Sequence, residues 1–315
     1  MTKIFIDGRA GTTGLQIEGR MGLRDDVTLI ELPESMKKDP AARKGAIQEA
    51  DYVFLCLPDA AAVEAAEMVE DSGTRIIDAS TAHRTNPAWA YGFPELSKAH
   101  REKIQTAQFV ANPGCHATGF ISLVYPLVQL GILPPDYPLA AHSLTGYTGG
   151  GKKMIAEYES PERDPEYDSP RHYGLSLSHK HIPEMMQVCG LTKKPIFCPI
   201  VCDFPQGMLV TVPLHFDLLP GAVSLASLQK AYSDFYAGET NIHVMPVMGE
   251  GVLKGGCLGS NNVVGTNDLN IFVCGNETQA IVAAQFDNLG KGASGAAVQC
   301  LNLVLGVEPT TGLEL

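Results

Sequence analysis

Residues 3–17 read KIFIDGRAGTTGLQI, and this stretch decides the fold of the first third of the chain. The apolar run KIFID predicts a β-strand, and the glycines behind it predict a tight turn into a helix that opens at Gly11. Gly8, Gly11 and Gly14 form a G-x-x-G-x-x-G pattern. Glycines at such a turn let the backbone approach a pyrophosphate, whose charge is stabilised by free amides and by the helix N-terminus. The stretch therefore predicts a dinucleotide-binding fold, although a turn without a ligand has the same pattern.

The segments that follow alternate between β-rich and helical character. Apolar runs at VTLIEL (27–32), DYVFLCLP (51–58), TRIIDAS (74–80) and AQFVANP (107–113) are separated by helical segments. This alternation predicts a Rossmann-like, doubly wound parallel sheet covered on both faces. After about residue 140 the strands become longer and alternating, which predicts an α+β catalytic domain with a mixed or antiparallel sheet. The polar, Pro-bearing stretch 159–174 reads as an exposed loop, with a lid over a site as the alternative.

Composition excludes several classes of function. The 315 residues carry a net charge of −12 and no long Lys/Arg run, so the electrostatic footprint of a nucleic-acid partner is missing. No run of about 18 apolar residues predicts a membrane segment, and the N-terminus lacks the features of a secretory leader. Eight scattered cysteines indicate reduced thiols in a cytoplasmic protein. Cys198 and Cys202 invite a metal interpretation, but zinc sites usually need two such pairs, so we expect no metal.

The preference for NAD or NADP stays open from the residues alone. Glu31 lies at the end of the second predicted strand, where an acid in NAD-specific sheets binds the ribose diol. Ser35, Lys37, Lys38 and Arg43 follow closely and could instead receive a 2′-phosphate. The two sets of residues point to different cofactors.

The stretch ANPGCHATGF (111–120) places Cys115 directly behind a Pro-Gly turn, at the predicted start of an apolar helix. A helix N-terminus stabilises anions, so a thiol at this position loses its proton more readily than a free cysteine. The segment HKHIPE (179–184) adds His179, His181 and Glu184. A histidine near its ordinary pKa can pass protons in either direction at neutral pH, and a carboxylate can orient it. Alone, Cys115 could be a small buried hydrophobe, and the His-x-His pair could be exposed or metal-binding.

Five ordered motifs together are far more specific than any of these features. They are DASTAHR (78–84), YGFPEL (91–96), NPGCHATGF (112–120), HKHIPE (179–184) and DNLGKGASGAAVQ (287–299). In this order the chain resembles the shorter branch of the N-acetyl-gamma-glutamyl-phosphate reductases, which are related to aspartate-semialdehyde dehydrogenase. The resemblance implies an NADP-binding Rossmann domain at 1–114, completed by a C-terminal helix at 288–315, and a catalytic and oligomerisation domain at 115–287. It also implies a homodimer or homotetramer.

The resemblance implies three groups of site residues. The catalytic group is Cys115 as nucleophile and His179 as acid/base, with Glu184 in support. The cofactor group is Gly8, Gly11, Thr12, Thr13, Gly14, Ser35, Cys56, Leu57, Pro58, Ser80, Asn288, Lys291 and Gly292. The substrate group is Arg84, Asn112, Gly149, Gly150 and His181. Arg84 is our candidate for the substrate phosphate because a guanidinium fork suits that group, although a salt bridge at a surface or a domain interface is an alternative. One position departs from the family pattern, since His116 stands where an aromatic residue is usual, and it could itself transfer protons.

The implied reaction is NADPH-dependent reduction of N-acetyl-L-glutamyl 5-phosphate to the 5-semialdehyde through a Cys115 thioester, in arginine biosynthesis. Three alternatives remain at this stage. A sister dehydrogenase would act on another acyl phosphate, such as aspartyl phosphate. A Cys/His hydrolase or acyltransferase would need no nucleotide, and a non-catalytic nucleotide sensor would bind NADPH without turnover.

Overall fold

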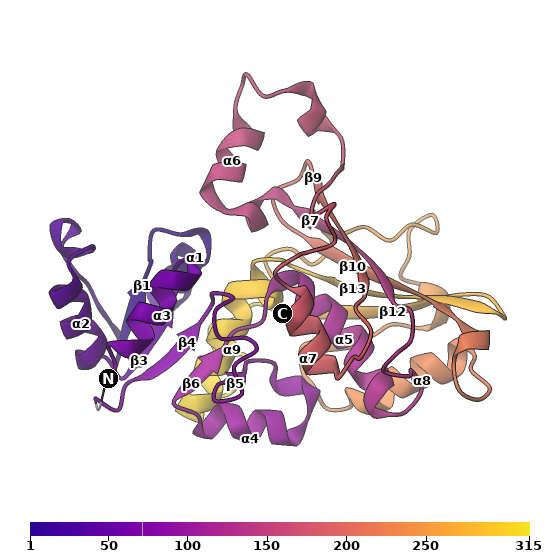
Figure 1. Ribbon diagram of the computed structural model, residues 1–315, viewed down its shortest axis with the longest axis horizontal. Helices are drawn as coiled ribbons and strands as arrows, with labels where there is room; N and C mark the ends of the chain where they lie inside the picture. The colour runs from indigo at the N-terminus through magenta and orange to yellow at the C-terminus, as the bar shows by residue number, and fades with distance from the viewer. Residues whose placement is uncertain (71) are drawn as a thin grey trace. The chain divides into compact units, whose positions relative to one another are not determined.

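The computed structural model describes residues 1–70 and 72–315, which form two compact units. The first unit comprises Met1–Gly114 and Ala293–Glu314, and the second comprises Cys115–Gly292 together with Leu315. Each unit is built around its own sheet (Figure 1). In the described part of the chain, no helix combines the length and the apolar character that a membrane crossing requires.

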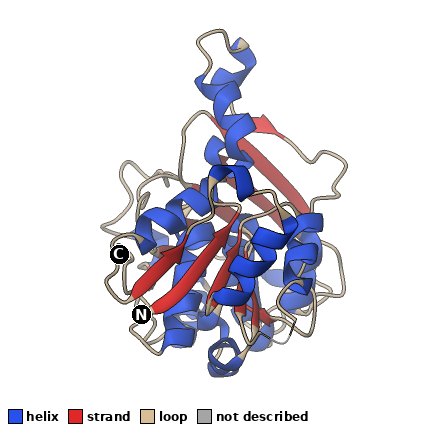
Figure 2. Cartoon of the chain, turned by 90° about the vertical axis from the view of Figure 1, so that its left-hand side faces the viewer, coloured by secondary structure: helices blue, strands red, loops and turns tan. Residues whose placement is uncertain are grey.

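The first unit contains a six-stranded sheet with the strand order β2-β1-β3-β4-β6-β5, in which every pairing is parallel. Helices flank these strands (Figure 2). Its elements are β1 (Thr2–Asp7), α1 (Thr12–Met21), β2 (Val27–Ile30), η1 (Glu34–Met36), α2 (Pro40–Glu49), β3 (Tyr52–Leu55), α3 (Asp59–Glu67), β4 (Arg75–Asp78), β5 (Ala90–Tyr91), η2 (Pro94–Leu96), α4 (Lys98–Thr106), β6 (Phe109–Ala111) and α9 (Gly295–Leu305). The predicted doubly wound fold is confirmed for this unit.

Alternation along β1 shows why the sheet is covered on both faces. Ile4 and Ile6 join an apolar cluster with residues of α1, α4 and α9, whereas Phe5 joins a second cluster with residues of α2 and α3. Successive side chains of a strand point to opposite faces, so a strand that is apolar throughout needs helices on both sides. The C-terminal helix α9 supplies Ala297, Val298 and Leu301 to the first cluster, which makes it part of the first unit's core.

The second unit contains a seven-stranded mixed sheet with the order β11-β12-β13-β10-β7-β9-β8. Its elements are α5 (Cys115–Gln129), β7 (Ala140–Gly146), η3 (Tyr147–Gly150), α6 (Gly151–Glu159), η4 (Pro165–Asp168), β8 (Arg171–His172), α7 (Ile182–Cys189), β9 (Ile196–Cys202), β10 (Met208–His215), η5 (Phe216–Leu218), α8 (Leu225–Phe235), β11 (Ile242–Val244), η6 (Val247–Gly249), β12 (Leu269–Gly275), β13 (Gln279–Phe286) and the π-helical turn η7 (Gly290–Ser294). The prediction of an α+β domain with a mixed sheet is confirmed.

Helix α5 is the centre of this unit. Twelve of its residues, from His116 to Leu127, are buried. The hydroxyl of Tyr232 on α8 donates to the carbonyl of Leu123 at 2.6 Å, and Tyr236 donates to the carbonyl of Ser122 at 2.8 Å. These two bonds tie α8 to the middle of α5 and fix the helix that begins at Cys115.

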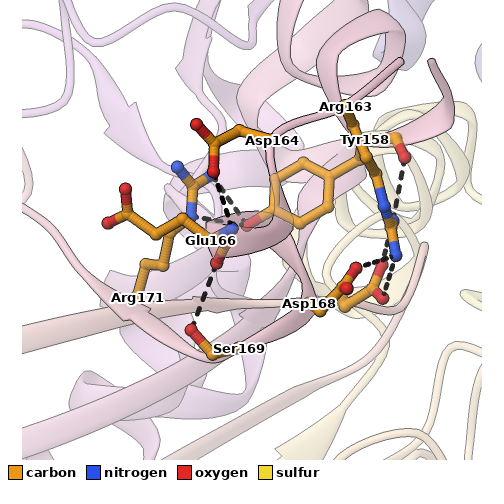
Figure 3. A network of polar contacts seen from close by, with 8 residues as sticks. Tyr158, Arg163, Asp164, Glu166, Asp168, Ser169 and Arg171 are labelled. Carbon is orange, nitrogen blue, oxygen red and sulfur yellow. Dashed lines mark hydrogen bonds and ion pairs between the residues drawn. The ribbon is translucent and has the colours of Figure 1, made fainter. Parts of the chain in front are cut away.

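The segment between β7 and β9 leaves the sheet and returns to it as β8. Helix α6 and the turn behind it stand away from the strands (Figure 1). Arg163 binds Asp203 with both terminal nitrogens at 2.8 Å, and Arg171 donates to the Tyr158 hydroxyl at 2.9 Å while its guanidinium lies 3.8 Å from the centre of the Tyr167 ring. Figure 3 shows both arginines beside Tyr158. The stretch 159–174, which reads as a loop in the sequence, is therefore held by its own hydrogen bonds and ion pairs and contains the short helix η4 and the strand β8.

Gly119 on α5 gives a test of this packing. A Cβ at position 119 would lie 2.5 Å from Val210 and 2.7 Å from Phe286, whereas a Cβ at Gly45 on α2 would meet nothing within 4 Å. We expect Gly119→Ala to destabilise the protein by about 2 kcal/mol through overpacking. The control Gly45→Ala should stabilise it by about 0.5 kcal/mol, because alanine favours helix. Calorimetric melting of both variants checks this, and equal melting temperatures would contradict the packing.

Candidate active site

The turn between β1 and α1 has the geometry that a bound pyrophosphate needs. Gly8 has φ +88°, and a Cβ there would lie 2.3 Å from the carbonyl oxygen of Cys56. The amide of Gly11 donates to the carbonyl of Gly8 at 2.9 Å. Thr12 begins α1, and its buried hydroxyl has no hydrogen-bond partner among the described residues. A cradle closed to any side chain and an unpartnered hydroxyl both fit a nucleotide diphosphate.

A pocket beside this turn is lined by residues of β1, β2 and the η1 region. Its lining includes Gly8, Arg9, Glu31 and Lys37. The carboxylate of Glu31 forms an ion pair with Arg9 at 2.9 Å, and Arg9 also pairs with Glu18. The carboxylate of Glu31, which could bind a ribose diol, is thus already paired with the Arg9 guanidinium. The sequence did not indicate a role for Arg9.

The other cofactor candidates of the first unit lie at the ends of its strands. Cys56, Leu57 and Pro58 follow β3, and burial raises the pKa of the Cys56 thiol to about 12. The hydroxyl of Ser80, just after β4, donates to Asp78 at 2.6 Å. Ser35 lies in η1, and Thr13 and Gly14 lie in the first turn of α1. All of these are at the carboxyl edge of the sheet or on elements that follow it, which is where open α/β sheets bind ligands.

Arg84 and Asn112 form a small buried arrangement after β4 and β6. The Nε of Arg84 donates to the carbonyl of Asn112 at 2.9 Å, and its Nη2 donates to the carbonyl of Ala79 at 3.0 Å. The amide nitrogen of the Asn112 side chain donates to the carbonyl of Ala293 at 3.0 Å. The Oδ1 of Asn112 is buried and has no hydrogen-bond partner in the part of the chain described. Two N–H groups of Arg84 therefore donate to backbone carbonyls, and Oδ1 of Asn112 is an acceptor that a ligand could use.

Cys115 is the first residue of α5 and is partly exposed. A Cβ at Gly292 would lie 3.0 Å from the Cβ of Cys115, so the chain passes close to the cysteine at this point. The sulfur is placed where the dipole of a long helix favours a negative charge. The position has the electrostatics that a nucleophilic thiolate requires.

His116, the next residue, is buried and bonded through both ring nitrogens. Its Nδ1 lies 2.6 Å from the Ser143 hydroxyl, and its Nε2 lies 2.7 Å from the Tyr173 hydroxyl. Burial, and then the charges of His179 and Lys180, lower the pKa of His116 to about 3. The imidazole is therefore neutral at pH 7. Neither Ser143 nor Tyr173 was singled out from the sequence, because only the fold brings β7 and the segment after β8 close to His116.

His179, His181 and Glu184 lie around the start of α7. The ring of His179 lies 5.6 Å from that of His116 and 4.9 Å from that of His181, measured between centroids. His181 and Glu184 are buried. Burial and the charge of Lys180 lower the pKa of His179 to about 4, so this histidine does not titrate near neutral pH.

One nitrogen from each of His116, His179 and His181 falls within 4.8 Å of the others, so the three could surround a divalent ion. Both nitrogens of His116 already take part in short hydrogen bonds. The geometry therefore favours proton chemistry at this cluster.

The remaining candidates of the second unit lie on its loops. Gly149 and Gly150 belong to η3, and Asn288 joins this loop by donating to the Thr148 hydroxyl at 3.1 Å. The amide of Gly207 donates to Oδ1 of Asn288 at 2.8 Å. Lys291 in η7 is almost wholly buried. Asn288 thus fixes the glycine-rich loop, and its predicted contact with cofactor remains a prediction.

Comparison with known proteins decides the family. Residues 13–107 match the family described as semialdehyde dehydrogenase, NAD binding domain, and residues 115–288 match semialdehyde dehydrogenase, dimerisation domain. The chain is 46% identical over 318 residues to N-acetyl-gamma-glutamyl-phosphate reductase 2 of Nostoc sp., with 99% of both chains covered. It is 47% identical to the N-acetyl-gamma-glutamyl-phosphate reductase of Brucella ovis, with 96% of this chain and 99% of the relative covered.

The chain belongs to the N-acetyl-gamma-glutamyl-phosphate reductase family. Solved structures agree with this at the level of the fold. Aspartate semialdehyde dehydrogenase II of Vibrio cholerae superimposes with a TM-score of 0.72 at 12% identity, covering 97% of this chain and 98% of its own. The enzyme of Francisella tularensis gives a TM-score of 0.72 and 12% identity, covering 97% of this chain and 100% of its own. The protein is an oxidoreductase of this family, with a domain for a nicotinamide cofactor.

The depressed pKa of His116 predicts a pH dependence of stability. In the unfolded chain a histidine binds a proton near pH 6.5, whereas folded His116 stays neutral until about pH 3. The unfolded state therefore binds more protons between these values, and stability falls as the pH falls. From pH 7 to pH 5 the wild type should lose about 2 kcal/mol more than His116→Phe. Urea unfolding at both pH values checks this, and parallel losses in the two proteins would contradict a neutral buried His116.

Proposed function

We propose that the protein reduces N-acetyl-L-glutamyl 5-phosphate with NADPH to N-acetyl-L-glutamate 5-semialdehyde and inorganic phosphate. The observation that carries the proposal is Cys115 at the first position of the buried helix α5, with His179 in the histidine cluster beside its neighbour His116. The full-length identity to enzymes named for this activity supports the same substrate.

In the proposed reaction the Cys115 thiolate attacks the acyl carbon of the substrate, and the bond from that carbon to the phosphate oxygen breaks. Phosphate leaves with the bonding electrons and a thioester remains. Bound NADPH supplies the hydride that reduces this thioester. The carbon–sulfur bond of the resulting thiohemiacetal then breaks, which releases the semialdehyde and returns the thiolate. The α5 amides stabilise negative charge that develops beside them.

His179 is the proposed acid/base residue. Its pKa of about 4 leaves it neutral at pH 7, so it can accept the proton of the Cys115 thiol and return it when the enzyme rests. His181 precedes α7, and Glu184 lies in the first turn of that helix, where both support His179 in our proposal. A low pKa also means that imidazolium is a minor form at pH 7 and that neutral His179 is a weak base.

Substrate contacts are proposed for residues whose groups suit an acylated amino acid phosphate. The buried acceptor Oδ1 of Asn112 suits an amide N–H of the substrate. Arg84 remains the candidate for the phosphate because of its charge, although two of its donors hold backbone carbonyls. Gly149 and Gly150 would allow the substrate to approach the backbone closely.

NADPH is the proposed cofactor rather than NADH. Arg9 neutralises Glu31 at the position where a free acid would repel a 2′-phosphate, and Lys37 lines the same pocket. The glycine turn with Thr12 would hold the pyrophosphate. Ser35 belongs to η1, which precedes Lys37, and stays a candidate for the 2′-phosphate.

A homodimer or homotetramer is proposed through the open face of the second sheet. Ile196 and Ile281 are each at least half exposed. The register places them on one face, because Ile281 pairs with Pro213, Thr211 pairs with His142, and Ala140 pairs with Ile196. An apolar sheet face of this kind is usually covered by a partner. We also propose a cytoplasmic enzyme, since all eight cysteines are free thiols, as expected in a reducing compartment.

The reverse reaction tests the proposed function. We expect NADP⁺ reduction by N-acetylglutamate semialdehyde to require inorganic phosphate, and aspartate semialdehyde to react far more slowly. Cys115→Ser should lose about 10³-fold or more of the rate, because serine is almost never ionised at neutral pH. Cys257→Ser, a change at an exposed thiol, is the control. Substantial turnover by Cys115→Ser, or turnover without phosphate, would contradict the mechanism.

The cofactor proposal has its own test. Replacing Arg9 by Gln removes a charged donor and should raise KM for NADP⁺ about tenfold or more, while KM for NAD⁺ changes little. Lys44→Gln, which removes an exposed ion pair with Glu70, should leave both values unchanged. An equal change for NADP⁺ and NAD⁺ in Arg9→Gln would show that Arg9 does not contact the 2′-phosphate.

A further inference from the structure

The imidazole of His116 is buried at the start of α5, and the reaction described above gives it no role. Its Nδ1 lies 2.6 Å from the hydroxyl of Ser143 on β7. Its Nε2 lies 2.7 Å from the hydroxyl of Tyr173, just after β8. Two hydroxyl groups therefore occupy both of the atoms through which an imidazole exchanges protons.

Counting protons gives the direction of both hydrogen bonds. A neutral imidazole carries one N–H, so His116 donates through one nitrogen and accepts through the other. Ser143 is fully buried, and its hydroxyl has no other hydrogen bond in the described part of the chain. Ser143 therefore donates to Nδ1, because a buried hydroxyl proton without an acceptor is costly. Nε2–H then donates to Tyr173, whose partial exposure lets its own proton reach solvent.

His179, the proposed acid/base residue, lies between β8 and α7 and belongs to neither element. Neighbouring rings surround its imidazole. Measured between centroids, the His179 ring lies 5.6 Å from His116, 5.8 Å from Tyr173, 5.2 Å from Phe197 and 4.9 Å from His181. In all four pairs the rings meet edge to face, which is a favourable arrangement. Ring contacts thus orient a side chain that has no regular secondary structure to hold it.

The ring of His116 connects this set of rings to rigid parts of the unit. It lies 5.3 Å from the ring of Phe197 on β9 and 5.4 Å from that of His181, measured between centroids. Its own position is fixed by α5, whose next eleven residues are all buried. Tyr173 is fixed in turn by its backbone amide, which donates to the carbonyl of Pro199 on β9 at 3.1 Å.

We propose that His116 is a positioning residue, whose ring holds the imidazole of His179 in one orientation and which transfers no proton itself. The inference rests on the proposed role of His179 as the acid/base residue. The hydrogen bonds from Ser143 and to Tyr173 offset the cost of burying a polar ring at this place. His116 acts only through His179.

The charge state of the ring agrees with this role. Burial, and then the charges of His179 and Lys180, lower the pKa of His116 to about 3, so the ring is neutral at pH 7. A proton that passed to His116 would have to replace a hydroxyl hydrogen bond and would charge a buried ring. The other ionisable groups around the cluster are Cys115 on α5, Tyr173 after β8, Lys180 beside His179, and His181 and Glu184 at the start of α7.

The test compares two replacements of His116. His116→Phe, combined with Ser143→Ala so that no buried hydroxyl loses its acceptor, keeps a ring and removes both nitrogens. His116→Ala removes the ring. We expect kcat of the phenylalanine variant in the reverse reaction to stay close to that of the wild type. In His116→Ala it should fall about 10²-fold, because a misplaced acid/base group is inefficient, while KM for the semialdehyde changes much less.

The pKa of His179 gives a second readout that does not depend on turnover. In ¹⁵N-histidine spectra it should stay near 4 in the phenylalanine variant and rise by about one unit or more in His116→Ala, because water reaches the ring. The control Phe235→Leu removes a ring on α8 that contacts Tyr125 and Tyr236, and it should change neither kcat nor this pKa. Equal losses of kcat in the two His116 variants, or no loss in folded His116→Ala, would overturn the inference.

A measurement on the unaltered protein keeps the proposal testable if a variant does not fold. We expect His116 to stay neutral from pH 5 to pH 9, with its proton on Nε2. Titration of His116 in this range, or a proton that moves between its two nitrogens, would overturn the inference. If those results came with an inactive Cys115→Ser, the inference alone would fail. Full activity of Cys115→Ser would instead contradict the proposed function.

Discussion

In the proposed reaction the Cys115 thiolate forms beside histidines that are uncharged at pH 7, and this constraint shapes the chemistry of the second unit. The sulfur of Cys115 lies at the first position of α5, and the two histidines whose pKa is lowered to about 3 and about 4 carry no charge at pH 7. Negative charge must then be stabilised by oriented dipoles and hydrogen-bond donors. A helix can do this only if it does not move, and the close packing at Gly119 and the tyrosine bonds from α8 hold α5 in place.

In the first unit, the proposed pyrophosphate site requires that backbone amides of the β1–α1 turn can approach the ligand closely. Gly8 has a positive φ and leaves no room for a Cβ, so the β1–α1 turn cannot exist with another residue in the same conformation. The unpartnered hydroxyl of Thr12 adds a polar group where a ligand would be bonded. Arg9 forms an ion pair with Glu31. A carboxylate that is paired with a cation repels a 2′-phosphate much less than a free carboxylate does.

The fold could be predicted because its signals are local. The strand–glycine–helix pattern at residues 3–17 and the alternating strands after residue 140 each depend on short stretches, and both predictions of sheet type are confirmed. The site was harder to predict because its contacts join residues that are far apart in the sequence. Ser143 and Tyr173 lie 27 and 57 residues from His116, and no spacing rule joins them. The lowered pKa of His179 depends on burial, which the segment HKHIPE does not reveal.

In the proposed mechanism Cys115 carries the acyl group. The most direct test of this is to mix the enzyme with N-acetyl-L-glutamyl 5-phosphate in the absence of NADPH, quench in acid and map the peptides by mass spectrometry. We expect one N-acetylglutamyl group on the peptide that contains Cys115, and we expect it to disappear when NADPH is added before the quench. An acyl group on any other side chain would contradict this mechanism. So would phosphate release that is faster than the spontaneous hydrolysis of the substrate while Cys115 stays unmodified.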